Sequence, residues 1–442
     1  MRMIRNVIAV AVGLLVVVAG LVAPAGVSEA APAGRLTLHA GRTITAQFSG
    51  TKLDKNRVVN LERSARGAAW RTVKAVRMNS KGAVNFGVVA SEPGYYRAVA
   101  RAFSYRVGTK RKVSARVVGQ TRHLAVPTFS EGFSGRTLRG AWRSRDEVGY
   151  RANGRLCSAP VRSNTVVKGG SAVLKMTKVR GSEAKAAIAK AKVNQRKANP
   201  AAVKAYAAVR KAKSAVARAK AMKRTTASQR KARSAAIKRA QVSLRKATTK
   251  LSALTPGCPN GVFHNAMITT RGGVKPVRSG TLVTRVKFSA AQGAHAGIWL
   301  QAANRQEIDV IETYGHGRGI TNVIHRLRGS TLQKDPEGAD AAYVAINAVR
   351  SRSWWSKWHT VAVSFDPGTI TFHLDGVKTR QLKGMKAADY DLMLSLLSSD
   401  WETARVTKPL ARSGSGVKNS SIKKQKNLPS MTVDWIRIWK KA

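Results

Sequence analysis

Acidic residues are scarce in this chain: 21 Asp and Glu stand against 80 Lys and Arg among 442 residues, giving a formal net charge of +59. A charge this one-sided predicts attraction to polyanions such as nucleic acid, anionic wall polymers or acidic membrane surfaces, without naming one of them. A hydrophobic content of 43% still provides for a core. The length indicates two or three domains.

Long apolar runs are absent after the N-terminus, so we expect no membrane span in the mature chain. The N-terminus has the pattern of an export signal: basic "MRMIRN", apolar "VIAVAVGLLVVVAGLV" and a small-x-small "SEA" ending at Ala30. We expect a signal peptide over 1–30, a mature chain from about Ala31, and a secreted protein. An uncleaved anchor is the alternative, which the Pro- and Ala-rich sequence after the signal disfavours.

Cysteine is also rare, with only Cys157 and Cys258. Two thiols are too few for a typical cysteine metal site, and in an oxidising compartment they favour a disulfide. That bond would close a loop of about 100 residues, worth about 4.7 kcal/mol in the chain-entropy model. Two free thiols are the alternative.

Residues 34–122 show seven short alternating stretches separated by turn residues: "RLTLHA", "RTITAQFSG", "RVVNLER", "WRTVKAVRM", "GAVNFGVVA", "GYYRAVARA" and "KVSARVV". This spacing predicts a small immunoglobulin-like β-sandwich. No residue pattern in it indicates catalysis. We interpret it as an accessory domain, either a binding module or a spacer.

Residues 182–254 contain 23 Ala, 21 Lys or Arg and a single acid, Glu183. Pro200 ends a first short helix, and Ser228 is positioned to cap a later one. Two heptad series predict an antiparallel helical hairpin. The series are Ala202, Val209 and Val216 with Ala205, Ala212 and Ala219, then Ile237, Leu244 and Leu251 with Ala240, Ala247 and Leu254.

The hairpin lies between the two cysteines, which indicates an insertion into a host domain and not a linker. Its cationic surface favours contact with an anionic polymer, and wall polymers are the first that an exported protein meets. A solvated insertion without a partner and a partly disordered one are the alternatives. The host, 128–442 without the insertion, is rich in short Val-, Ile-, Thr- and Phe-containing stretches, which predict one large antiparallel β-sandwich.

Three carboxylates gather in "QEIDVIETYG": Glu307, Asp309 and Glu312. In a strand, Glu307 and Asp309 share a face, and a one-residue bulge would return Glu312 to it. Two such glutamates with carboxyls about 5 to 5.5 Å apart are what retaining glycoside hydrolysis requires. A calcium site and an exposed acidic strand are the alternatives, although the segment has the pattern of a strand and not of a loop that wraps an ion.

The segment resembles the E-[I/L]-D-x-x-E signature of glycoside hydrolase family 16, in its bulged, laminarinase-type form. Four other stretches are similar to family motifs in the same order: "TFSEGFSGRTLRGAW", "TRVKFSAAQGAHAGIWL", "WHTVAVSFDPGTITFHLDG" and "MTVDWIRIW". The resemblance covers most of 128–442 apart from 182–254. It implies a concanavalin-like β-jelly roll with Glu307 as nucleophile, Glu312 as acid/base and Asp309 as the assisting carboxylate.

The resemblance also implies substrate contacts for Trp299, His325 and, more weakly, Trp401, for each of which packing is the alternative. Trp354 and Trp355 are expected as rim aromatics or packing residues. It implies no redox or nucleotide cofactor; relatives carry a structural calcium ion, for which this sequence has no signature. The chain departs from the family pattern at Gln306, at "AHAG" before Trp299 and at "LLSSDWE", where substrate-binding loops are expected.

The leading hypothesis is therefore a secreted retaining endo-β-glycosidase, with β-1,3-glucan as the substrate that the resemblance most often implies. A non-catalytic glycan- or wall-binding protein, anchored by the basic insertion, is the alternative from another class. An exported nucleic-acid-binding protein has only the charge in its favour, and nucleic acid is not the expected partner.

Overall fold

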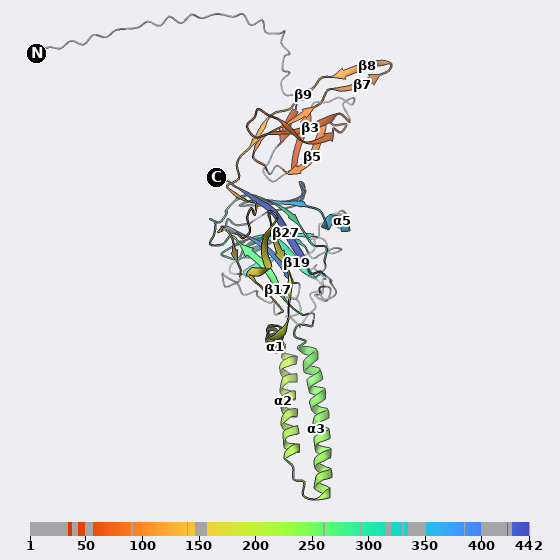
Figure 1. Ribbon diagram of the computed structural model, residues 1–442, viewed down its shortest axis with the longest axis vertical. Helices are drawn as coiled ribbons and strands as arrows, with labels where there is room; N and C mark the ends of the chain where they lie inside the picture. The colour runs from red at the N-terminus through yellow and green to blue at the C-terminus, as the bar shows by residue number, and fades with distance from the viewer. Residues whose placement is uncertain are drawn as a thin grey trace, which may run out of the picture.

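The computed structural model (Figure 1) describes most of the chain beyond its first 33 residues. The described residues are 34–37, 43–48, 56–89, 92–138, 140–145, 157–259, 261–291, 293–313, 320–328, 331–334, 351–383, 385–398, 422 and 427–441. The expected signal peptide lies outside them. No helix among them is both long enough and apolar enough to cross a bilayer.

The N-terminal part is a β-sandwich, and the predicted fold class is confirmed. One sheet has the order β1-β2-β5 and the other β10-β6-β3-β4, with β9 also paired to β6. Phe86, Ile44 and Leu61 are fully buried between the sheets. The strands are β1 Gly34–Thr37, β2 Thr43–Phe48, β3 Val58–Ser64, β4 Arg71–Arg77, β5 Ala83–Val89, β6 Gly94–Ala100, β9 Val117–Val118 and β10 Arg122–Leu124.

The end of this sandwich differs from the prediction in two places. The stretch predicted as one strand, "KVSARVV", is divided between β9 and β8 (Lys110–Ser114), and β8 pairs with β7 (Phe103–Val107) in a separate hairpin. Gly108 turns this hairpin with φ +59°, a conformation that glycine adopts without strain. The last strand, β10, also extends past the expected boundary at 122.

The C-terminal part is a jelly roll of two packed sheets, as predicted. The eight-stranded sheet has the order β14-β15-β27-β18-β23-β24-β25, with β11 on β27. Its strands are β11 Phe129–Glu131, β14 Thr165–Lys168, β15 Ser171–Lys175, β18 Gly280–Lys287, β23 His359–Asp366, β24 Thr369–Leu374, β25 Val377–Lys383 and β27 Ser430–Lys440.

The nine-stranded sheet has the order β12-β17-β26-β19-β20-β21-β22, with β13 and β16 on β17. Its strands are β12 Arg143–Ser144, β13 Ser158–Pro160, β16 Thr177–Val179, β17 Val262–Thr269, β19 Ala294–Ala302, β20 Glu307–Thr313, β21 Ile320–Arg328, β22 Thr331–Lys334 and β26 Tyr390–Ser398. Alternate side chains of both sheets, such as Leu282, Ile298 and Phe372, fill one shared core. Such alternation leaves the other face of each sheet available for other contacts.

Two tryptophans that the sequence predicted as either rim aromatics or packing residues are packing residues. Trp354 and Trp355 lie in the short helix α5 (Arg352–Trp355), and both are buried in the jelly-roll core. The Trp354 ring stacks on His359 at 3.9 Å between centroids. They therefore stabilise the jelly roll and provide no exposed ring surface.

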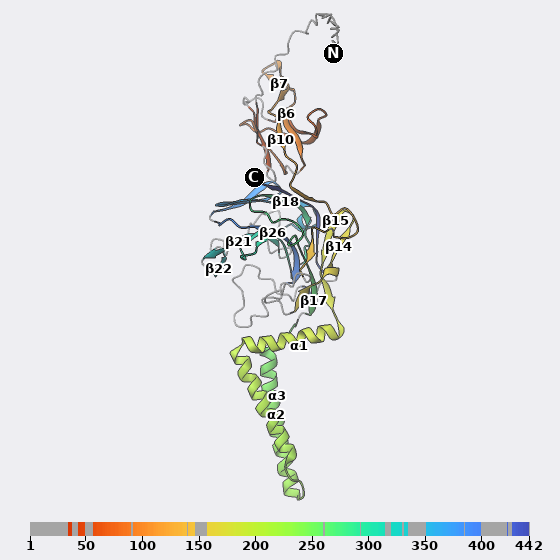
Figure 2. The ribbon, with the colours of Figure 1, turned by 90° about the vertical axis from the view of Figure 1, so that its left-hand side faces the viewer.

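Three helices leave the jelly roll between β16 and β17: α1 (Gly181–Ala198), α2 (Pro200–Ala221) and α3 (Ala227–Leu254). Figure 2 shows α1 lying across the base while α2 and α3 project from it as an antiparallel pair. Pro200 is the first residue of α2, a position where its missing N–H costs nothing. The predicted cap at Ser228 is wrong, because Thr226 caps α3 in a capping box with Gln229.

The predicted disulfide between Cys157 and Cys258 is present, with Cα atoms 5.5 Å apart. It lies with Val179, Ala191 and Val262 in a small apolar cluster beneath α1. The bond therefore joins the segments that flank the helical insertion to each other and to the jelly roll.

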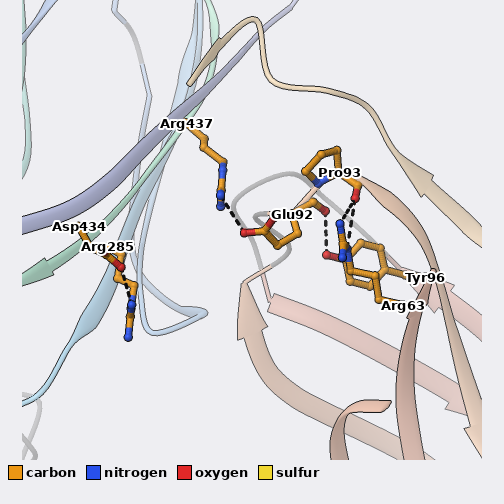
Figure 3. Close-up of polar contacts among 7 residues, drawn as sticks. All are labelled: Arg63, Glu92, Pro93, Tyr96, Arg285, Asp434 and Arg437. Atoms are coloured by element: carbon orange, nitrogen blue, oxygen red, sulfur yellow. Dashed lines mark hydrogen bonds and ion pairs between the residues drawn. The ribbon is translucent and has the colours of Figure 1, made fainter. Parts of the chain in front are cut away.

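The N-terminal sandwich packs on the outer face of the eight-stranded sheet. Val283, Ala362 and Trp439 from that face belong to the same apolar cluster as the sandwich core. At the edge of this contact, Arg437 pairs with Glu92 at 2.8 Å (Figure 3). The two parts thus share buried apolar surface, which couples them more firmly than a flexible tether would.

Candidate active site

Strand β20 carries the three carboxylates, and its core-facing residues explain how they come to share a face. Ile308, Val310 and Ile311 are all buried in the jelly-roll core. In the pairing with β19, Asp309 lies opposite Trp299 and Ile311 opposite Ile298, so Val310 has no partner. This extra residue is a β-bulge, and it returns Glu312 to the outer face that already carries the other two carboxylates.

The bulge leaves the Val310 carbonyl outside the regular ladder, and a buried side chain satisfies it. Asn322 on β21 donates its Nδ2 hydrogen to the Val310 oxygen at 2.6 Å. The Oδ1 atom of Asn322 in turn accepts a hydrogen bond from Thr379 Oγ1 at 2.8 Å. Because a buried carbonyl without a partner is costly, this contact favours the bulged register over a regular one.

Glu312 is held by a histidine from the neighbouring strand. His295 Nε2 lies 2.6 Å from Glu312 Oε1, and the two side chains are 15% and 13% exposed. Gly297 lies directly opposite Glu312 on β19 and, being a glycine, places no side chain beside the carboxylate. A Cβ atom there would lie 3.2 Å from Ser395 Oγ and 3.4 Å from the Trp299 ring, so the site is built around a glycine.

Glu307 has its own polar partner, Gln301, which donates Nε2 to Glu307 Oε2 at 3.1 Å. Asp391 faces Gln301 from the next strand, β26. Asp391 Oδ2 accepts from Arg271 Nε at 2.7 Å, which places a cation at this end of the same face. Between the two glutamates, Asp309 is only 3% exposed, so the middle carboxylate is the most buried of the three.

Trp299 lies on the predicted face, opposite Asp309 in register, but the residue is only 8% exposed. It packs with Met267, Met393 and Leu397 in an apolar cluster separate from the main core. Its Nε1 donates to Ser395 Oγ at 3.1 Å. In this arrangement Trp299 supports the carboxylate-bearing face from within, and a stacking role toward substrate stays a prediction.

The other two predicted contact residues fall largely outside the described part. The backbone of His325 is in β21, opposite Glu307 in register, while its side chain is not among those described. Trp401 lies outside the described residues altogether. Across the side chains that are described, no three His, Cys, Asp or Glu gather as metal ligands.

The sequence prediction missed His295, Gln301 and Asn322. For the first two a signal was present: in "AHAGIWLQA", every second residue from His295 falls on the face of Trp299. Asn322 gave no such signal, because its partner is fixed only by the register of β20 against β21.

The sequence model of the family described as glycosyl hydrolases family 16 matches residues 220–436, a range that contains the whole of β20. The solved laminarinase catalytic domain from Thermotoga maritima MSB8 is 13% identical to this chain, with a TM-score of 0.40, covering 72% of this chain and 98% of that one. The endo-β-1,3-glucanase from Pyrococcus furiosus is also 13% identical, with a TM-score of 0.40, covering 73% and 95%. No curated protein matches the chain.

The family match spans the strand with the three carboxylates and most strands of both jelly-roll sheets. It agrees with the antiparallel architecture and with the bulge that gathers Glu307, Asp309 and Glu312 on one face. The jelly-roll domain of this chain therefore belongs to the glycosyl hydrolases family 16.

Proposed function

We propose that this protein is an exported, retaining endo-β-glycosidase that hydrolyses a β-glucan, with β-1,3 linkages as the first candidate. The observation that carries the proposal is the bulge in β20, which presents Glu307 and Glu312 on one face with Asp309 buried between them. The sequence motifs favour β-1,3-glucan, and the basic, apolar and small-residue order of 1–30 favours export.

In the first half-reaction, the Glu307 carboxylate attacks the anomeric carbon and forms a glycosyl ester, while Glu312 gives its proton to the departing glycosidic oxygen. In the second, Glu312 takes a proton from water, the water oxygen attacks the anomeric carbon, and the ester bond to Glu307 breaks. Two displacements at the same carbon return the original anomeric configuration.

The neighbours of the two glutamates suit these different tasks. Gln301 donates to one oxygen of Glu307, which orients the carboxylate while it stays available as a nucleophile. His295 contacts one oxygen of Glu312, which fixes the rotamer of the group that moves the proton. Asp309, buried on the same face of β20, adds a third carboxylate beside the two glutamates.

The test is reducing-sugar release from laminarin, mixed-linkage glucan and galactan by the mature protein and by its Glu307→Gln and Glu312→Gln variants. We expect release from a β-1,3-linked substrate and a loss of about 10³-fold or more in each variant, the scale on which nucleophilic catalysis is lost. Glu62→Gln, which removes a carboxylate in the N-terminal sandwich, is the matched control and keeps full activity. Release of nothing by a folded protein would contradict the proposal and favour a glycan-binding role.

Two further measurements address the finer parts of the proposal. Proton NMR of the first product reports whether the new reducing end keeps the β configuration, and an α product would contradict a retaining mechanism. N-terminal sequencing of protein recovered from the culture medium is expected to begin near Ala31, and a chain that stays inside cells would contradict export.

A further inference from the structure

The α2–α3 hairpin projects from the jelly roll and packs mainly on itself. Figure 1 shows both helices extending from the end opposite the N-terminal sandwich, and Figure 2 shows the same from the side. The buried residues of α2 are Ala202, Ala205, Val209, Ala212 and Ala219, which line the seam with α3, and no residue of α3 is fully buried. The hairpin therefore contributes little to the core that supports the carboxylates.

The tip of the hairpin is nonetheless stabilised by specific hydrogen bonds. Thr226 and Gln229 form the capping box at the start of α3. Arg233 donates two hydrogen bonds, from Nε at 3.1 Å and Nη2 at 3.0 Å, to the Lys220 carbonyl near the end of α2. These contacts satisfy helix-end groups that would otherwise depend on water.

The base of the hairpin is also held by specific contacts, two hydrogen bonds and a disulfide. Gln195, with no exposed surface, makes two hydrogen bonds to Gly257, accepting from its N–H at 2.8 Å and donating to its carbonyl at 2.9 Å. The adjacent disulfide between Cys157 and Cys258 holds the same segment on the jelly roll. A structure fixed at base and tip is a rigid arm and not a loose loop.

Every charged side chain of this arm is a cation. Residues 200–254 contain 16 Lys and Arg and no Asp or Glu. Heptad spacing repeats cations along one face of each helix about every 10.5 Å, two helical turns. These exposed lines are Lys204, Lys211 and Arg218 on α2, and Lys231, Lys238 and Arg245 on α3. Without an external anion, this charge destabilises the hairpin by self-repulsion.

We propose that the α2–α3 hairpin is a binding arm for a linear phosphodiester polymer of polyol units, of the kind that a cell wall presents outside the cell. Charge complementarity along the two helices is the attraction, since each phosphate neutralised by Lys or Arg releases a counterion.

The composition of the arm favours a simple polyol chain over single-stranded nucleic acid. Binding of single strands relies on aromatic side chains that stack on bases. The one aromatic in 200–254 is Tyr206, and Arg196 already lies over its ring at 3.9 Å. A surface with charge but no stacking platform recognises backbone phosphates alone, and the export proposed above places it where wall polymers are.

The test measures the affinity of the full mature chain for soluble poly(glycerol phosphate) by fluorescence anisotropy, from about 50 to 200 mM salt. One variant replaces the α2 line by glutamine, and a second replaces the α3 line. Glutamine removes the charge and keeps a good helix propensity, so far-UV circular dichroism should not change. A matched control removes three exposed cations from the N-terminal sandwich: Arg66, Arg71 and Lys74.

Each lost phosphate contact lowers the slope of log affinity against log salt by about 0.7 to 0.9. We therefore expect each hairpin variant to lose about two units of slope and about tenfold to a hundredfold in affinity at 0.1 M salt, with the control within about twofold. Glu307→Gln is expected to bind as tightly as the parent chain, which separates this proposal from the catalytic one.

Three outcomes would overturn the proposal. An equal loss in the control variant would show that diffuse net charge, and not the arm, binds the polymer. Unchanged affinity in both hairpin variants would exclude the arm. Tighter binding to duplex DNA or poly-L-glutamate than to poly(glycerol phosphate) of the same charge would assign a different partner.

Discussion

Replacing Asn322 is the sharpest test of how the fold presents Glu312. The Asn322→Ala variant removes the hydrogen bond to the Val310 carbonyl and the one from Thr379. Both Asn322 and Val310 are buried, so water does not replace the lost donor easily. An unsatisfied buried carbonyl costs about 1–3 kcal/mol, and the lost second bond adds about 1 kcal/mol.

We therefore expect the free energy of unfolding to fall by about 2–4 kcal/mol, with a drop in Tm of roughly 4–16 °C for a domain of this size. A weakened bulge also competes with the unbulged register, in which Glu312 would turn toward the core. Because the glutamate is then misplaced in part of the population, kcat on the glucan substrate should fall more than tenfold at a temperature where the variant is still folded.

Thr379→Val is the matched control, because it removes only the hydrogen bond to Asn322 Oδ1 and keeps the shape of the side chain. It is expected to cost about 1 kcal/mol and to keep kcat within about twofold. The measurements are urea denaturation and steady-state kinetics on the same preparations. Should Asn322→Ala lose stability while its kcat equals that of the control, the idea that this contact sets the position of Glu312 would be refuted.

Three other changes test separate parts of the molecule. His295→Phe removes a contact to Glu312 and is expected to lower kcat by about 10- to 100-fold with little change in KM. His295→Gln should recover part of the lost kcat. Equal kcat in the two variants would count against a role for the contact. Replacing Cys157 and Cys258 by Ser is expected to lower the free energy of unfolding by about 3–5 kcal/mol in urea, and dithiothreitol should destabilise the parent but not the variant. Burial raises the pKa of Tyr390 above its ordinary value of 10, so the folded state holds the phenol proton more tightly than the unfolded state does. The free energy of unfolding should therefore fall as the pH rises above about 10. Tyr390→Phe should make that fall shallower, and thermal melts across the alkaline range would check it.

The sequence was sufficient for features in which the pattern is local. The heptads placed Ala202 and Val209 on a seam, and both are buried there. The five-residue spacing of Glu307 and Glu312 required a bulge if both were to share a face, and β20 has one. In each case the period of the element alone determines which side chains lie together.

Features that depend on long-range register could not be obtained in the same way. His295 meets Glu312 only because β19 pairs with β20, and Asn322 reaches Val310 only because β21 pairs on the other side. Alternation along β19 places His295 on the face of Trp299 without naming Glu312 as its partner, and nothing in the neighbourhood of Asn322 distinguishes it from an ordinary polar residue of a strand. The wrong prediction of Ser228 as the cap of α3 has a local cause instead. The sequence contains the T-x-x-Q pattern of a capping box at Thr226, and that pattern identifies the true cap.

The positions of the two additions to the jelly roll bear on how one chain could serve two polymers. The N-terminal sandwich covers the outer face of the eight-stranded sheet through Val283, Ala362 and Trp439. The carboxylates occupy the outer face of the other sheet, and the helices depart from β16 and β17 at its edge. The N-terminal sandwich thus covers the sheet that does not carry the carboxylates, and α2 and α3 project away from the jelly roll (Figure 2). Anchoring would then raise the local concentration of enzyme at a wall without any new contact to the glucan, which is the advantage that a rigid, separate arm gives over added charge around the site.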